Sequence, residues 1–391
     1  MSNYAVIVCF TYVKNARYAL NPRYVKADLR RVLTYSFNHL KNSLERTSII
    51  TDILPEKYKI DEVNLSFQHE VISFLADSGL INAGASPNTN LFPLKWLYQF
   101  CQEHKLDYKE IYARVKTEIT PVIRTSNVIE FAYLFTKFTL ISGKHEFTDL
   151  LQRKLSEIPL KTKLLFYFTG HAIKRTRTKE ANKVCSDVET VYMLIPNKNH
   201  GSSFIADSVI RDILRSLKTT VQVFFILDCC YSQQFIDTVY KTTFSNHGNQ
   251  VLFENVGASM DKIILDEDID NIFYIGSTLG DQTCGFYSVS PEEGSVFTFF
   301  LLKYMNEIVL RKSENSVSQL YQSVEKPILK YRKSKEEPKQ NIILCKNNNF
   351  AATSLAAALP GWLFATYEHA TIDSDSWSPD ILEQNHENKS I

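Results

Sequence analysis

A histidine and a pair of cysteines stand where two apolar segments of the sequence end. His171 lies at the end of FYFTGHA, and Cys229 and Cys230 lie near the end of FFILDCCYS. Each apolar run has the length and aromatic content of a buried strand, and open α/β sheets bind ligands at the carboxyl ends of their strands. A thiol beside a histidine base becomes a thiolate that attacks a carbonyl carbon. The pattern therefore predicts nucleophilic cysteine catalysis.

The same residues also have a structural interpretation. A single histidine near a strand end is more often part of the packing than of a reaction, and a buried cysteine is usually inert. Here both residue types follow predicted parallel strands, each behind at least four apolar residues. The joint pattern favours chemistry over packing.

The elements that would position these residues alternate between strands and helices. Such alternation predicts a mainly parallel sheet with helices on both faces. The predicted strands are 4–12, 48–53, 163–169, 190–195, 221–227, 271–277 and 340–345. The predicted helices between them are 23–44, 146–157, 205–217, 294–309 and 316–330.

Residues 57–145 interrupt this alternation. They show apolar residues at helical spacing and no strand pattern, with helices predicted at 66–78, 92–104, 106–118 and 127–141. We expect a helical insertion outside the catalytic sheet that gates substrates or binds a partner. Residues 347–391 are predicted to be a C-terminal extension, partly disordered because of its polar end.

Composition narrows the class of protein. The chain has 391 residues, of which 44% are hydrophobic and 22% charged, with a formal net charge of +1, so wholesale disorder and a global nucleic-acid-binding field are excluded. Its seven cysteines form no CxxC pair, which argues against a disulfide framework and a structural zinc site. Neither a signal peptide nor a membrane span is recognisable. We expect a cytoplasmic protein that binds neither membrane nor nucleic acid, with the basic run IKRTRTKE (173–180) as a solvated loop.

Three segments of the chain resemble the metacaspases, cysteine peptidases of the caspase-like C14 type. These are T-G-H at 169–171, D-C-C-x-S at 228–232, and IGSTLGDQTCGF at 275–286 with the GSVFTFFLL that follows. The resemblance extends over about 1–56 and 146–346, the predicted peptidase domain. It implies a caspase-like three-layer αβα fold with a mainly parallel central sheet, to which the helical insertion is added.

The resemblance also implies catalytic roles. Cys230 matches the nucleophile because the family pattern is Asp, any residue, Cys, and Cys229 then points to the opposite face for core packing. His171 would act as general base and then as acid, and the backbone N–H groups of Ala172 and Cys230 would form the oxyanion hole. The family usually has glycine where this chain has Ala172; a positive φ there would cost about 1 kcal/mol.

Asp228 carries the expectation about specificity. In metacaspases the matching acid lies in a pocket that selects Arg or Lys, whereas caspases proper have Gln and select Asp. Asp228 could instead only cap or orient its loop. The family's second pocket acid is expected near Val25 or Lys26, with Asp28 just beyond, and a lysine there would weaken basic specificity.

Calcium is a further expectation from the family, although no cofactor is required for the chemistry. Asp237 matches one calcium ligand, Asp207 matches one of an acidic pair whose partner is Ser208 here, and Glu189 or Asp187 would supply another. Calcium needs six to eight oxygen ligands, so this depleted set predicts weak binding or none. Each of these acids also has a plain interpretation as a surface or capping residue.

The resulting expectation is a thiol endopeptidase that acts on proteins or peptides after Arg or Lys. It would process itself in the polar linker 233–270, after Lys241 or Lys262, and the early first strand leaves no prodomain for recruitment. Two alternatives stay open. Ala172, the missing second acid and Gln233 in place of the family's glycine favour a weak or inactive protein that binds a partner. An Asp-directed enzyme would cut the same linker after an aspartate.

Overall fold

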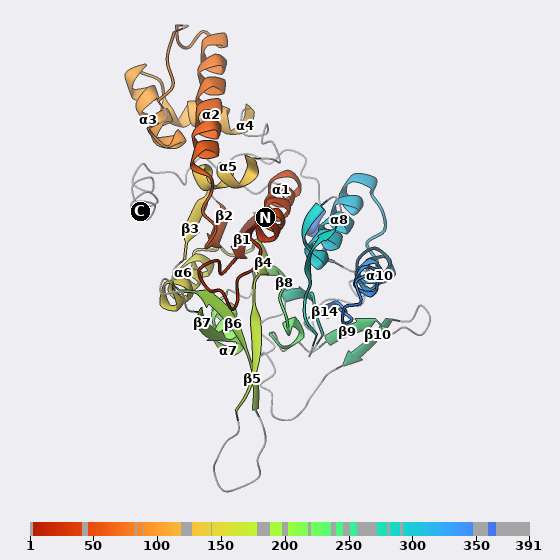
Figure 1. Ribbon diagram of the computed structural model, residues 1–391. Coiled ribbons are helices and arrows are strands. Elements are labelled where there is room, and N and C mark those ends of the chain that lie inside the picture. The colour runs from red at the N-terminus through yellow and green to blue at the C-terminus, as the bar shows by residue number, and fades with distance from the viewer. Residues whose placement is uncertain are drawn as a thin grey trace. The chain divides into compact units, whose positions relative to one another are not determined.

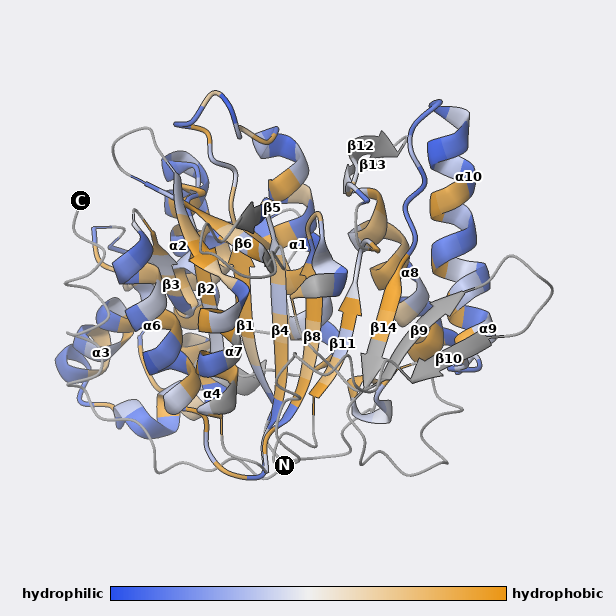
Figure 2. Cartoon of the chain, turned by 90° about the horizontal axis from the view of Figure 1, so that it is seen from below, coloured by the Kyte–Doolittle hydropathy of each residue, from blue (hydrophilic) through white to orange (hydrophobic). Residues whose placement is uncertain are grey.

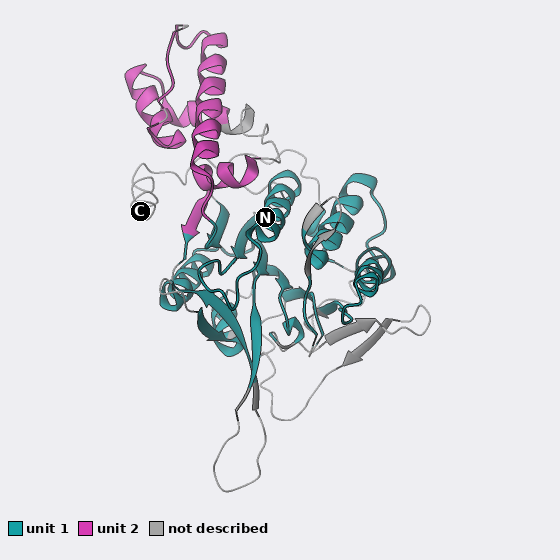
Figure 3. Ribbon diagram, viewed as in Figure 1, with its two compact units in different colours: residues 1–53, 140–366 teal, residues 54–139, 367–391 magenta. Residues whose placement is uncertain are grey.

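The chain forms two compact units, which Figure 3 colours separately. Unit 1 comprises Met1–Ile53 and Leu140–Thr366, and unit 2 comprises Leu54–Thr139 and Tyr367–Ile391. The sequence placed the corresponding divisions at 56/57 and 145/146. The computed structural model describes residues 3–40, 46–82, 84–88, 90–118, 127–141, 143–177, 188–197, 202–217, 220–235, 240–244, 251–255, 272–279, 282–289, 292–346 and 359–364.

The large sheet of unit 1 is parallel in its centre (Figure 1), which confirms the predicted α/β class with a mainly parallel sheet. In sheet order the strands are β10 (Val251–Asn255), β9 (Tyr240–Phe244), β14 (Ile343–Lys346), β11 (Ile272–Gly276), β8 (Gln222–Asp228), β4 (Lys163–Thr169), β1 (Asn3–Cys9) and β2 (Thr47–Thr51). The strands from β2 through β11 run parallel, whereas β14, β9 and β10 are each antiparallel to their neighbours.

Helices cover both faces of these strands, and Figure 2 shows the apolar strands between amphipathic helices. On one face α1 (Pro22–His39), α8 (Val296–Arg311) and α10 (Lys326–Ser334) pack together, with α9 (Val317–Leu320) joined to α10 by a π-helical turn. On the other face lie α6 (Lys144–Ser156) and α7 (Asp207–Arg215). The result is the three-layer arrangement that the sequence predicts.

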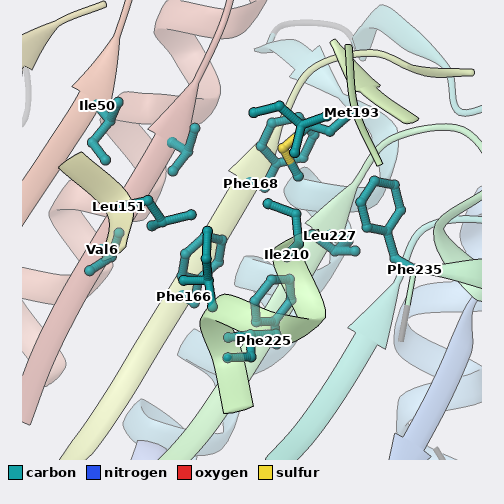
Figure 4. Close-up of a cluster of buried hydrophobic side chains, with 14 of the residues drawn as sticks. Val6, Ile50, Leu151, Phe166, Phe168, Met193, Ile210, Phe225, Leu227 and Phe235 are labelled. Atoms are coloured by element: carbon teal, nitrogen blue, oxygen red, sulfur yellow. The ribbon is translucent and has the colours of Figure 1, made fainter. Parts of the chain in front are cut away.

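Strand β4 shows why a continuous apolar run folds this way. Phe166 and Phe168 point into the core cluster with α6 and α7, where Phe166 stacks on Phe225 of β8 at 4.3 Å between ring centroids (Figure 4). Tyr167 points the other way, and its hydroxyl lies 2.8 Å from Oγ1 of Thr298 in α8. Both faces of the strand are therefore buried, as expected for a central parallel strand.

A small antiparallel sheet follows the His171 segment and corrects one expectation. The basic run predicted as a loop begins with strand β5 (Ala172–Arg177), which pairs with β6 (Val188–Pro196). Strand β6 in turn pairs with β7 (Ser202–Ala206). Basic side chains suit this strand because Arg175 is exposed and its guanidinium lies over the Phe204 ring, 4.2 Å from the ring centroid. A hairpin of β12 (Phe286–Val289) and β13 (Glu292–Ser295) precedes α8.

The segment predicted as an all-helical insertion contains four helices and one strand among its described residues. The helices are α2 (Lys57–Asp77), α3 (Pro93–Glu103), α4 (Tyr108–Glu118) and α5 (Val128–Phe135). The prediction of a helix through residue 141 is wrong, because α5 ends at Phe135 and Lys137–Leu140 form strand β3. Thr136 is extended, and the aromatic and β-branched residues after it favour a strand.

Part of the predicted C-terminal extension is packed into unit 1. Leu359 and Leu363 are fully buried, in the described segment 359–364. The Tyr35 hydroxyl of α1 donates to the Leu363 carbonyl at 3.0 Å, and the Asn315 side-chain amide donates to the Leu359 carbonyl at 2.7 Å. These contacts fasten the short segment to α1 and to Asn315.

Candidate active site

His171 and Cys230 follow neighbouring strands at matching positions. Thr169 at the end of β4 pairs with Asp228 at the end of β8, and the N–H of Gly170 donates to the Asp228 carbonyl at 3.3 Å. Each functional residue comes two positions after this last pair. Because adjacent strands are about 4.8 Å apart, both residues emerge at the same carboxyl edge of the sheet.

The imidazole of His171 is held by a backbone carbonyl. Its Nε2 lies 2.9 Å from the carbonyl oxygen of Tyr18. A carbonyl only accepts hydrogen bonds, so Nε2 carries the proton and Nδ1 is left as the basic nitrogen. Burial lowers the pKa of His171, and the bond to Tyr18 partly opposes that effect. The ring is therefore a neutral base near pH 7.

Tyr12 is a buried residue at this site that sequence reasoning missed. Its hydroxyl accepts the His171 N–H at 3.0 Å and donates to the Leu194 carbonyl at 2.9 Å, and its ring centroid lies 5.2 Å from the imidazole. Tyr12 has a positive φ of 54°, an uncommon conformation for a residue with a bulky side chain. Gly170 leaves room for it, since a Cβ there would lie 2.6 Å from the Tyr12 hydroxyl.

Asp52, directly after β2, holds the Tyr12 turn in place. Its Oδ2 accepts the Tyr12 N–H at 2.7 Å, and its Oδ1 accepts the Thr11 N–H at 2.7 Å. The Thr11 hydroxyl adds a third bond at 3.0 Å. The sequence signal for both residues was their place at the end of a buried strand, which also marked His171.

The two adjacent cysteines have opposite environments. Cys229 is fully buried in the core cluster with α6 and α7, and burial raises its pKa. Cys230 is half-buried, and a hydrogen bond from the Cys284 side chain lowers its pKa to about 7, against the opposing effect of burial. Cys284 remains a protonated thiol, because that hydrogen bond and its burial raise its pKa. Of the two adjacent cysteines, Cys230 is the thiol whose surroundings favour the thiolate.

The loop that carries Cys230 is fastened to the loop after β11. The Ser232 N–H donates to the Thr278 hydroxyl at 3.1 Å, and the Ser232 hydroxyl donates to the Thr278 carbonyl at 3.1 Å. The Ser277 hydroxyl donates to the Cys229 carbonyl at 3.1 Å. These buried bonds fix the backbone on both sides of Cys230.

The backbone at Ala172 suits an oxyanion donor. The Leu194 N–H donates to the His171 carbonyl at 3.0 Å, so Ala172 and its partner Met193 form a non-hydrogen-bonded pair. The Ala172 N–H therefore points away from β6, toward the open edge of β5. Ala172 begins a strand and is not among the described residues with positive φ, so alanine in place of glycine carries no conformational cost.

Asp228 lies at the end of β8 with one carboxylate oxygen unmatched. The Thr298 hydroxyl of α8 donates to Oδ2 at 2.6 Å, whereas no donor among the described residues lies at hydrogen-bonding distance and angle from Oδ1. Burial raises the pKa of Asp228 to about 6, and the nearby hydroxyls of Ser295, Thr298 and Ser277 only partly offset that effect. A fully buried acid with a bare oxygen is suited to receiving a donor from a ligand.

Asp28 is the buried acid near Asp228, where sequence reasoning pointed first to Val25 or Lys26. It is fully buried on α1; burial and the charge of Asp228 raise its pKa, while Arg31 and the Ser295 N–H lower it. Arg31 Nη1 lies 3.0 Å from Asp28 Oδ1, and the Ser295 N–H donates to Oδ2 at 2.8 Å. Gly294 permits this arrangement, since a Cβ would lie 2.3 Å from Arg31 Nη1.

Of the residues predicted to bind calcium, only Asp207 has a described side chain. Asp207 begins α7, where its Oδ1 accepts the Ser208 N–H at 2.7 Å, as a helix-terminal acid does. Glu189 lies in β6, and Asp237 lies outside the described residues. In the described part of the chain, no group of three or more His, Cys, Asp or Glu side chains could hold a metal ion.

The predicted processing linker contains two strands that the sequence did not reveal. Lys241 lies in β9, which pairs on one side with β10 and on the other with β14. Lys262 lies outside the described residues. A backbone paired on both sides must leave the sheet before a peptidase can bind it, so the position of Lys241 counts against cleavage there.

The described helices include none with the length and apolar composition of a membrane span.

Comparison with known proteins supports the resemblance on which these roles rest. Residues 137–239 match the family described as metacaspase, peptidase C14 domain, which confirms the resemblance over this part of the chain. A search of curated proteins found no match. The crystal structure of protein GSU0716 from Geobacter sulfurreducens is similar over 92% of this chain and 98% of that chain, with 9% sequence identity and a TM-score of 0.42.

Proposed function

We propose that the protein is a cysteine endopeptidase of metacaspase type that cleaves proteins or peptides after Arg or Lys. The observation that carries the proposal is the pairing of His171 and Cys230 beyond the matched ends of β4 and β8. One residue is a neutral base with Nε2 already bonded, and the other is a thiol whose pKa is lowered to about 7. A thiol and a base with those properties form the unit that acyl transfer needs.

The proposed reaction uses the chain's own groups and water. Cys230 transfers its proton to Nδ1 of His171, and the thiolate attacks the carbonyl carbon of the scissile bond. The N–H groups of Ala172 and Cys230 would stabilise the oxyanion. His171 then gives its proton to the leaving amine, which leaves an acyl-enzyme on Cys230. Water, deprotonated by His171, releases the acid and restores the thiol.

The preference for a basic residue rests on the charges beside the catalytic loop. Asp228 and Asp28 are two buried carboxylates, and Arg31 supplies one guanidinium that is bonded to Asp28. Asp228 keeps an oxygen without a donor. A substrate Arg or Lys would supply the missing positive charge and donor, and an uncompensated buried carboxylate costs on the order of several kcal/mol.

Arg31 is also the observation that favours a second candidate, an Asp-directed enzyme. A guanidinium near the end of β8 could in principle select an acidic side chain. Its Nη1 is already paired with Asp28, and its side chain also packs over the Phe299 ring at 5.2 Å. Because Asp228 lies in the same region and would repel an acidic substrate, we favour the basic specificity.

Self-processing and calcium dependence remain proposals that accompany this function. Cleavage after Lys262 is favoured over cleavage after Lys241, since β9 would first have to separate from β10 and β14. The described residues hold no group of three or more His, Cys, Asp or Glu side chains that could bind a metal ion, and the side chains of Glu189 and Asp237 lie outside them. No catalytic step above requires a metal, and activity measured across a calcium titration tests that view.

A peptide panel with Arg, Lys or Asp before the scissile bond tests the proposed function. We expect hydrolysis of the Arg and Lys peptides. Cys230→Ala and His171→Ala should each lower kcat by about 10⁴-fold or more, because the pair acts as a unit. Cys229→Ala is the matched control and should keep at least about a tenth of the activity, since Cys229 faces the core. Activity that survives Cys230→Ala, or preference for the Asp peptide, would overturn the proposal.

A further inference from the structure

A second thiol lies against the proposed nucleophile. Cys284 and Cys230 are both half-buried, free cysteines. The side chain and the backbone N–H of Cys284 both lower the pKa of Cys230 by hydrogen bonding. Gln340, which accepts the N–H of the next residue, Gly285, at 3.1 Å, also donates to the carbonyl of Ser277, whose hydroxyl donates to the Cys229 carbonyl. The two cysteines Cys230 and Cys284 therefore lie beside one another, and the only role given to Cys284 so far is to lower the pKa of Cys230.

Contacts of both loops hold the two thiols in position. Cys230 follows β8 and Cys284 follows β11, and these strands pair in parallel up to Leu227 and Gly276. The bonds between Ser232 and Thr278 join the beginnings of the two loops. A fixed separation of this kind favours reaction between the two sulfurs over reaction with outside thiols.

The far end of the Cys284 loop is also anchored. The N–H of Gly285, the next residue, donates to Oε1 of Gln340 at 3.1 Å, and the Gly285 carbonyl accepts the Val296 N–H at 3.3 Å. Gln340 is buried and is itself bonded to Arg332 Nη1 at 3.1 Å. Cys284 is consequently fixed between two tethered segments and cannot swing away from Cys230 without breaking buried bonds.

We propose that Cys230 and Cys284 form a reversible disulfide when the protein meets a hydroperoxide, which turns the Cys284 thiol into a resolving group for the active site. The Cys230 thiolate attacks the peroxide, the O–O bond breaks, and Cys230 becomes a sulfenic acid while hydroxide or water leaves. The Cys284 sulfur then attacks the Cys230 sulfur, the S–O bond breaks, and water leaves. A dithiol reductant returns both thiols.

The same pairing predicts protection of the nucleophile. A sulfenic acid with no thiol within reach is oxidised further to sulfinic acid, which reductants do not reverse. Cys229 cannot take the place of Cys284 because it points into the core cluster with Leu227 and Phe235. The consequence for activity rests on the proposed peptidase function, whereas formation of the disulfide does not.

Peptide mapping by mass spectrometry tests the proposal on the full chain. The wild type, Cys284→Ser and the matched control Cys229→Ser are treated with hydrogen peroxide and then with dithiothreitol. Cys284→Ser keeps a hydroxyl donor near Cys230, and each variant's activity is compared with its own reduced sample. We expect wild type and Cys229→Ser to yield a linked peptide that contains Cys230 and Cys284, with the loss of two hydrogen atoms that dithiothreitol restores.

The activity measurements and the mass measurements separate the two proposals. Peroxide should lower wild-type hydrolysis by about tenfold or more with recovery in dithiothreitol, while Cys284→Ser should accumulate sulfinic acid at Cys230 and stay inactive. A linked Cys230–Cys284 peptide in protein that hydrolyses no peptide would support the disulfide and refute the peptidase. Sulfinic acid at Cys230 forming equally fast in wild type and Cys284→Ser, or a link to a different cysteine, would overturn the disulfide in an active enzyme.

Discussion

The ends of β2 and β8 each carry an aspartate, half-buried Asp52 and fully buried Asp228, and the two differ in how many hydrogen bonds their oxygens accept. Asp52 after β2 accepts three hydrogen bonds, shared over both of its oxygens. Within the described part of the chain, Asp228 at the end of β8 has a hydrogen-bond partner on Oδ2 and none on Oδ1. Burial raises the pKa of both acids, so titration alone does not distinguish them. The number of hydrogen bonds that each carboxylate accepts does distinguish them. Asp52 stabilises its own turn, while Asp228 has an oxygen left for a ligand.

Removing the charge at the end of β8 should give the largest effect on hydrolysis of an Arg peptide among the four changes below. Asp228→Asn should lower kcat/KM for an Arg peptide by about 100- to 1,000-fold, because a desolvated charge pair contributes on the order of 2–5 kcal/mol. A peptide with citrulline in place of Arg, similar in shape but uncharged, serves as the control and should lose much less. Equal losses for the two peptides would place Asp228 outside the specificity pocket.

The corresponding change at the end of β2 should affect stability instead of selectivity. Asp52→Asn keeps one acceptor but turns an amide NH₂ toward a backbone N–H, so the free energy of unfolding should fall by about 2–4 kcal/mol. Urea unfolding of both variants provides the measurement. The ratio of Arg to citrulline hydrolysis should be unchanged. A large shift in that ratio would mean that Asp52 also contacts the substrate.

The preference for Arg should depend on pH through Asp228. Burial raises its pKa in the folded protein to about 6, so its charge is present above that value and is lost as pH falls below it. Between pH 7 and pH 5 the Arg-to-citrulline ratio of kcat/KM should fall by about tenfold. Taking the ratio cancels the titration of His171 and Cys230, which affects both peptides alike. A ratio constant over this range would contradict an ionised Asp228 as the selecting group.

Tyr12 is bonded both to Asp52 and to His171, and loss of its hydroxyl should give the smallest effect on activity. Tyr12→Phe leaves the His171 N–H and the Leu194 carbonyl without their partner, which should lower kcat by about three- to tenfold with little change in KM. Tyr18→Phe is the matched control, because Tyr18 holds the imidazole through its backbone carbonyl and should remain near wild type. A KM change that exceeds the kcat change would assign Tyr12 to substrate binding.

Local sequence patterns predicted the central strands and the two principal site residues. Strand 163–169 was placed at its observed bounds and strand 221–227 within one residue, because both are buried on each face and read as continuous apolar runs. The positions of His171 and Cys230 followed from those strand ends. The choice of Cys230 over Cys229 came from the family pattern and from the alternation of side chains along a strand.

The rest of the site depends on contacts between distant parts of the chain. Asp28 meets the Ser295 N–H across 267 positions, and the fit requires Gly294, so no local pattern identifies it. The pairing of Cys284 with Cys230 likewise depends on two loops that only the sheet brings together. Strand β5 escaped notice because its basic residues resemble a solvated loop, and one neighbouring strand was enough to order it.

Covalent labelling tests the central claim most directly. An Arg peptide that ends in a chloromethyl ketone would be attacked by the catalytic thiol and leave a thioether on it. We expect a single label on Cys230, located by peptide mapping, and much slower labelling by the analogue that carries Asp in place of Arg. His171→Ala should also slow the reaction. A label on Cys229 or Cys284, or faster labelling by the Asp analogue, would contradict the account.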